Sequence, residues 1–170
     1  MRAKTILLFL CGWGVLLVQS GNAQSGGTST KAPSAKGPWI GTWKYNAAKS
    51  TPPGRADGGP RIFKMELVGE DGFRYTIDDT SADGRQSHME MKFARFDEKD
   101  YPEQGNPSAD TNRFRIADPH TYELTDRKDG KDTIHFRITI SDDGKTRTSV
   151  STGVAQDGKE FKRIGVWDRQ

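Results

Sequence analysis

Cysteine is almost missing from this 170-residue chain, whose single thiol, Cys11, lies in an apolar run near the first residue. One cysteine cannot form an internal disulfide, which excludes the disulfide-rich class of small exported domains. Lipid attachment to Cys11 is not expected either, because Leu10, not a small residue, precedes it. Hydrophobic residues make up only 32% of the chain, and no apolar run reaches the roughly 20 residues of a membrane-spanning helix. These shortages exclude a polytopic membrane protein, and the length is that of one domain.

The first 23 residues have the pattern of a secretory signal peptide. A basic start with Arg2 and Lys4 leads into an apolar run over residues 5–18, and small residues precede a cleavage site after Ala23. An uncleaved membrane anchor is the alternative, but the run is short for a bilayer span. We therefore expect a cleaved chain in the periplasm or the extracellular space, with no stable membrane span.

Removal of residues 1–23 leaves a chain that is close to neutral. The whole chain has 26 basic and 23 acidic residues; the removed segment holds two basic and no acidic ones, so 24 and 23 remain, a balance of +1. Such a balance argues against nucleic acid as a partner. Five arginines on predicted strands are interpreted as a salt-bridged outer face rather than an aromatic and basic nucleic-acid face: Arg113, Arg115, Arg137, Arg147 and Arg163.

Residues 24–37 form a predicted flexible linker of Ser, Gly, Thr, Lys, Ala and Pro, so the folded domain is expected over residues 38–170. In that domain apolar residues alternate with polar ones, which predicts strands with one dry face and little helix. The alternating apolar sets are Phe63, Met65 and Leu67; Phe73, Tyr75 and Ile77; Met89, Met91 and Phe93; Phe114 and Ile116; Tyr122 and Leu124; and Ile134, Phe136, Ile138 and Ile140.

Asp-Gly pairs separate these runs and predict tight hairpin turns. The pairs stand at residues 71–72, 83–84, 129–130, 143–144 and 157–158. Short connections make consecutive strands antiparallel neighbours, which leaves two architectures, a closed barrel or two packed sheets. Closure removes exposed sheet edges, so we expect an all-β, antiparallel up-and-down barrel of about 8–10 strands.

The sequence offers no pattern for catalysis or metal binding. Its histidines, His88, His120 and His135, have no ligand spacing, and the Asp-Gly turns lack the spaced carboxylates of a calcium loop. Nucleophile motifs and a glycine-rich phosphate loop are also missing. We expect surface histidines, no metal, no cofactor and a protein that is not an enzyme; catalysis by two carboxylates that are distant in the sequence is the alternative.

Two short stretches carry a family resemblance. Gly41-Thr42-Trp43 at the start of the first strand resembles the G-x-W signature of the lipocalins and fatty-acid-binding proteins, the calycin superfamily. Residues 165–169 at the end resemble the closing strand of the fatty-acid-binding proteins. The resemblance implies a barrel that Trp43 closes at one end, with an arginine of the last strand, Arg163 or Arg169, against its ring.

Residues 46–50, 96–102 and 105–110 resemble a narrower group, small secreted bacterial proteins with lipocalin-like domains and no established activity. This implies a bacterial host. Two departures from the fatty-acid-binding proteins stand out. Residues 46–61, rich in Pro and Gly, cannot form the helical pair of that family, and Gly165 stands where its carboxylate-binding arginine would be.

A barrel of this size either fills with side chains or encloses one small ligand. We expect a cavity that binds a small hydrophobic or amphipathic ligand, with Arg163 as the partner of a charged head group. The expected wall residues are Trp43, Tyr75, Met89, Phe136 and Trp167.

The long connection over residues 97–111, with Tyr101, Pro102 and Asn106, is expected to lie near the opening, as a lid or as a simple cover. The alternative function is a filled barrel that binds or inhibits another exported protein through this loop. A cavity of roughly 300 Å³ or more distinguishes the two.

Overall fold

The computed structural model describes residues 33–52, 59–155 and 158–170, so the expected signal peptide lies outside the described residues. The strands are β1 (Gly41–Tyr45), β2 (Arg61–Val68), β3 (Gly72–Thr80), β4 (Gln86–Arg95), β5 (Asp100–Pro102), β6 (Thr111–Asp118), β7 (Thr121–Lys128), β8 (Lys131–Ile140), β9 (Thr146–Val154) and β10 (Glu160–Arg169). One short 3₁₀ helix, η1 (Ala47–Lys49), follows β1. The expectation of an all-β fold with little helix is confirmed.

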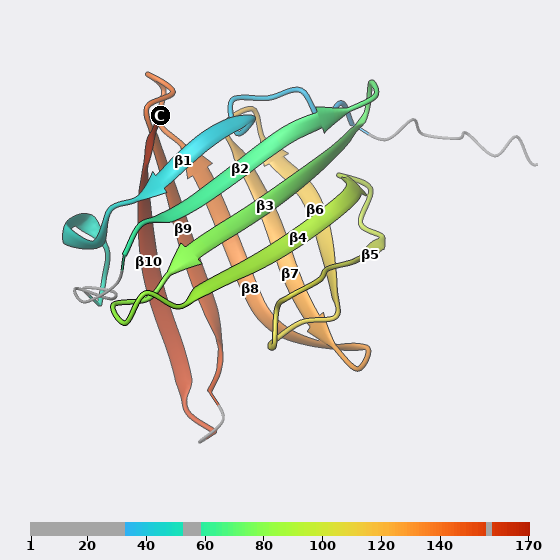
Figure 1. Ribbon diagram of the computed structural model, residues 1–170. Helices are drawn as coiled ribbons and strands as arrows, with labels where there is room; N and C mark the ends of the chain where they lie inside the picture. Colours follow the sequence, from blue (N-terminus) through green and yellow to red (C-terminus); the bar gives the residue numbers. More distant parts are fainter. Residues whose placement is uncertain (1–32, 53–58, 156–157) are drawn as a thin grey trace, which may run out of the picture. The chain divides into compact units, whose positions relative to one another are not determined.

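All ten strands belong to one antiparallel sheet in the order β4-β3-β2-β1-β10-β9-β8-β7-β6-β5. Chain neighbours pair throughout, and β1 pairs with β10, Trp43 opposite Arg169, which brings the two ends of the meander together (Figure 1). Between β4 and the segment after β5 the sheet is joined by a single bridge, Glu90 with Gln104. The structure is therefore a nearly closed up-and-down barrel, as the turn pattern predicted.

Trp39 and Trp43 fill the barrel end near both β1 and the C-terminus, and we call these two side chains the aromatic plug. Trp43 is fully buried and its Nε1 donates to the Trp39 carbonyl at 3.1 Å, while Trp39 Nε1 donates to the Ala35 carbonyl at 3.0 Å. The Arg169 guanidinium lies 4.1 Å from the Trp43 ring centroid. The expected pairing of Trp43 with an arginine of the last strand is confirmed, and the core already includes Ala35, ahead of the expected start at residue 38.

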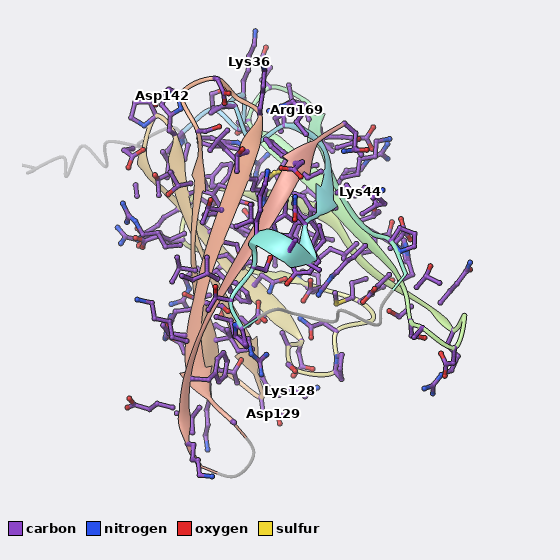
Figure 2. The ribbon with its side chains drawn as sticks, turned by 90° about the vertical axis from the view of Figure 1, so that its left-hand side faces the viewer. Lys36, Lys44, Lys128, Asp129, Asp142 and Arg169 are labelled. Atoms are coloured by element: carbon purple, nitrogen blue, oxygen red, sulfur yellow. The ribbon has the colours of Figure 1, made fainter. Side chains whose placement is uncertain are left out.

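Gly41 explains why the G-x-W pattern needs its glycine. Its φ of +141° is unfavourable for other residues, and a methyl group at this position would overlap the Arg169 guanidinium. That guanidinium donates to the carbonyls of Pro38, Ile40 and Gly144 and so ties the segment before β1 to the end of β10. Figure 2 shows Arg169 at one end of the barrel and Asp129, in the β7–β8 turn, at the other.

A register shift between β3 and β4 changes which β4 residues face inward. Tyr75 pairs with Met91, whereas Phe73 pairs with Ala94. An extra residue in one strand reverses the alternation beyond it, so Phe93 points outward and packs on Tyr101 with ring centroids 6.0 Å apart. The expectation that Phe93 belongs to the dry face is wrong for this reason. Leu67 was also expected inside, but it is 41% exposed near the end of β2.

The outer face carries the salt bridges that the interspersed charges predicted. Arg137 Nη1 is 2.7 Å from Glu123, Arg115 also pairs with Glu123, and Arg113 is 3.1 Å from Asp100. The same interpretation is wrong for Arg147, which is 6% exposed and points into the barrel. In the described part of the chain no helix is long and apolar enough to cross a membrane.

Candidate functional site

The barrel encloses a cavity of about 450 Å³. Residues of β1 to β4 and β6 to β10 line it, together with the segments that follow η1 and β5. Most of the lining is apolar or aromatic: Tyr45, Phe63, Met65, Tyr75, Ile77, Met89, Phe114, Tyr122, Leu124, Ile134, Phe136, Ile138, Phe161, Ile164 and Trp167. The barrel is filled at the Trp43 end and hollow farther along its axis.

The cavity reaches the surface at the end opposite the plug. Four of its lining residues are exposed: Thr51, Pro52, Ser108 and Arg163. Ser108 belongs to the connection between β5 and β6, and Arg163 lies on β10, with its guanidinium 4.5 Å from the Phe161 ring centroid. Ser108, within residues 97–111, therefore lies on this rim, and whether ligands enter there stays a prediction.

Five of the six residues expected to bind a ligand line this cavity: Tyr75, Met89, Phe136, Arg163 and Trp167. Trp43 does not, because it belongs to the aromatic plug and is covered by Trp39 and Arg169. Arg163 contributes to the exposed rim and not to the buried wall. The structure thus brings most of the expected wall together, and whether these residues bind a ligand stays a prediction.

The segment expected as a long loop over residues 97–111 contains strand β5, which pairs with β6. Tyr101 and Pro102 lie on β5, away from the cavity lining, and the Tyr101 hydroxyl donates to Asp97 at 3.0 Å. Burial and this contact with Asp97 raise the pKa of Tyr101 to about 12. Asn106 lies beyond β5 and lines the cavity. The part of this segment that serves the cavity is therefore the stretch after β5, which also supplies Glu103.

A buried polar cluster connects that stretch to the barrel wall. The Tyr75 hydroxyl contacts Glu103 and lies 3.1 Å from Asn112 Oδ1. Asn112 Nδ2 donates to Asp126 at 2.7 Å, and Asn106 Nδ2 donates to Glu103 at 2.7 Å and to Asp126 at 3.5 Å. The five side chains form one continuous network, which holds residues 103–106 against β3, β6 and β7.

The two carboxyl groups of this buried cluster, Glu103 and Asp126, lie close together, and this changes pKa values within the cluster. Burial and the neighbouring Glu103 raise the pKa of Asp126 to about 7, against an ordinary value of 3.8. Burial and the Glu103 charge also raise the pKa of the Tyr75 hydroxyl well above its usual value. Asp126 therefore keeps its proton up to a pH of about 7. The cluster lies beside the cavity, which Glu103, Tyr75 and Asp126 help to line.

Sequence reasoning missed Glu103, Asp126 and Arg147 as interior residues. Asp126 follows Tyr122 and Leu124 in the inward alternation of β7, so its direction could have been found. Arg147 pairs with Ile140 across the turn at Asp143-Gly144, and paired residues share a face of the sheet. The turn therefore signals that Arg147 points inward. Glu103 had no such signal, because it lies outside the regular strands.

Metal-ligating side chains are dispersed over the described part of the chain. Within residues 33–52, 59–155 and 158–170, no group of three or more His, Cys, Asp or Glu side chains is placed to hold a metal ion. His88 and His135 are exposed, and His120 is half-buried in the turn before β7. No protein family matches this sequence, and no curated protein is significantly similar to it.

Proposed function

We propose that this protein binds a small hydrophobic or amphipathic molecule inside its barrel. The observation that carries the proposal is the cavity of about 450 Å³ with a mostly apolar lining and an exposed rim. Ligand pockets in proteins usually measure roughly 300–1,000 Å³. Side chains around an unfilled space lose dispersion contacts, and an apolar ligand would restore them.

The alternative, a filled barrel that binds another exported protein through residues 97–111, has less support. It requires a packed interior and a protruding loop, whereas Glu103 and Asn106 of that segment turn inward and line the cavity. Catalysis is also the weaker candidate, because no histidine or cysteine stands among the described lining residues. The carboxyl groups of Glu103 and Asp126 are already bonded to Tyr75, Asn106 and Asn112. We propose binding without turnover, and no cofactor.

We also propose that the barrel is lipocalin-like and that the protein acts after export. The burial of Trp43 under Arg169 and the β1–β10 closure support a calycin-type barrel. The pattern of residues 1–23 supports export to the periplasm or the extracellular space.

Binding can be tested with N-phenyl-1-naphthylamine, an uncharged probe whose fluorescence rises in apolar surroundings. Ser151 is 8% exposed and lines the cavity, while its neighbour Thr152 points to the outside. Ser151→Phe should fill part of the cavity and weaken probe binding at least tenfold, by direct steric exclusion. Thr152→Phe adds the same ring to the outer face and is the matched control.

Wild-type protein and Thr152→Phe should bind the probe with equal affinity, and circular dichroism should show the same β-sheet content in all three proteins. A wild-type protein that binds no probe would contradict interior binding. Equal affinity of Ser151→Phe and wild type would place the probe outside the barrel and would contradict it as well.

A further inference from the structure

Two buried hydrogen-bond donors in the cavity wall have no acceptor among the described residues. Arg147 on β9 and Trp167 on β10 are register partners, each is 6% exposed, and both line the cavity. Arg147 Nε and Trp167 Nε1 are buried, and neither has a hydrogen-bond partner in the described part of the chain. Buried donors are normally paired, so two adjacent unpaired donors are an unusual feature of a barrel wall.

The Arg147 charge also has no carboxylate partner among the described residues. Its Nη2 donates to the Tyr122 hydroxyl at 3.1 Å, and its guanidinium lies 4.3 Å from the Phe63 ring centroid and 5.4 Å from that of Trp167. Aromatic rings attract a cation but do not replace an anion. A buried charge without a counter-ion costs folding free energy. No described carboxylate offsets this cost for Arg147.

We infer that Arg147 and Trp167 form a site for the anionic group of an organic ligand held in the cavity. The inference rests on the proposed interior binding and adds the chemical class of the ligand. A carboxylate or sulfonate oxygen at this place accepts from the guanidinium and from the indole N–H, and it supplies the missing counter-charge. The expected head-group partner, Arg163, lies on the exposed rim instead.

The acidic cluster restricts the ligand to one anionic group. Glu103 and Asp126 line the cavity from the segment after β5 and from β7, whereas Arg147 and Trp167 belong to β9 and β10. A second anionic group near them would meet negative charge, because the donors of Tyr75, Asn106 and Asn112 already bind these carboxyl groups. Leu124, Phe136 and Ile138, by contrast, suit an apolar body. The ligand class is therefore an organic monoanion with a compact apolar or aromatic part.

Two fluorescent probes with the same aromatic body separate this inference from the proposed function. 1-Anilinonaphthalene-8-sulfonate carries one sulfonate, and N-phenyl-1-naphthylamine carries none. Arg147→Met keeps an apolar chain of similar length but removes the charge. It should weaken binding of the sulfonate about 10- to 100-fold, the range for loss of a charged hydrogen bond, and leave binding of the neutral probe within about threefold.

Arg137→Met removes a similar charge from the outer wall and is the control, which should bind both probes as wild type does. Trp167→Phe removes only the indole donor and should weaken sulfonate binding about three- to tenfold. Equal losses of both probes in Arg147→Met, or no loss of either, would overturn the anion site while interior binding stands. Failure of wild type to bind the neutral probe would overturn the proposed function itself.

Displacement of the fluorescent sulfonate at pH 8 tests whether the cavity accepts only one anionic group. Naphthalene-1-sulfonate should displace the fluorescent sulfonate at a concentration at least tenfold lower than naphthalene-1,5-disulfonate. Equal displacement by the two compounds would overturn the role given to Glu103 and Asp126.

Discussion

The folding stability of this barrel should fall as pH rises from 4 to 8, and Asp126 should be responsible. In the folded chain the pKa of Asp126 is raised to about 7 by burial and by Glu103, while the ordinary value is 3.8. Between these two values the unfolded chain has released the proton and the folded chain still holds it. The unfolded state therefore binds fewer protons, which means that the free energy of unfolding decreases with increasing pH.

The size of the effect follows from the two pKa values. Each pH unit between them corresponds to about 1.4 kcal/mol, so the full change from Asp126 is about 4 kcal/mol. The loss begins near the ordinary value of 3.8 and is complete above the folded value of about 7. A change of this size is a large part of the stability of a small domain, typically about 5–15 kcal/mol.

Asp126→Asn isolates this contribution, because an amide of the same shape does not ionise. Urea unfolding followed by tryptophan fluorescence, repeated from pH 4 to pH 9, gives the free energy of unfolding of both proteins. The difference between variant and wild type should grow by about 4 kcal/mol in favour of the variant over this range. Any change in the hydrogen bonds of Asn106 and Asn112 adds only an offset that does not depend on pH.

Asp142→Asn, in the exposed β8–β9 turn, is the control, and its curve should run parallel to that of wild type. The reasoning would be refuted if Asp126→Asn and wild type showed the same pH dependence. Equal pH dependence would mean that the buried acid does not hold its proton.

Two further predictions concern the barrel end and the start of the mature chain. Trp43→Ala should lower the free energy of unfolding by roughly 3–5 kcal/mol, because it empties the centre of the plug and removes the ring beneath Arg169; urea unfolding measures this, and a loss below 1 kcal/mol would contradict the assigned packing. N-terminal sequencing of exported protein should return Gln24 as the first residue, whereas Met1, or a lipid on Cys11, would contradict cleavage after Ala23.

The strand pattern and the order of the strands could be predicted because both depend on local features. Alternation of apolar and polar residues places side chains on one face within each strand, and the glycine turns limit each strand to its chain neighbours. The Asp71-Gly72 pair was predicted as the turn between β2 and β3, but the glycine with positive φ, +68°, is Gly69, and Gly72 already begins β3. Such a shift leaves the topology unchanged, since the neighbouring strand is the same.

The direction of individual side chains was less predictable where the local signal failed. Phe93 follows the alternation of β4 but lies beyond a register shift that only the pairing of β3 with β4 creates. Arg147 lies on β9, where both faces carry Ser and Thr, so the hydrophobic pattern did not indicate which face is inside. Its inward direction follows from pairing with Ile140 and Trp167.

The sequence alone determined an all-β meander, the order of its strands and the burial of Trp43 at one barrel end. Each of these depends on neighbouring residues or on one short motif. Only the tertiary structure decided that the interior is partly hollow and that Glu103, Asp126 and Arg147 face it. The physical reason is that the free volume of a barrel depends on the side chains of all its strands together. Likewise, the pKa of Asp126 and the unpaired donors of Arg147 and Trp167 depend on which residues of distant strands meet across the interior.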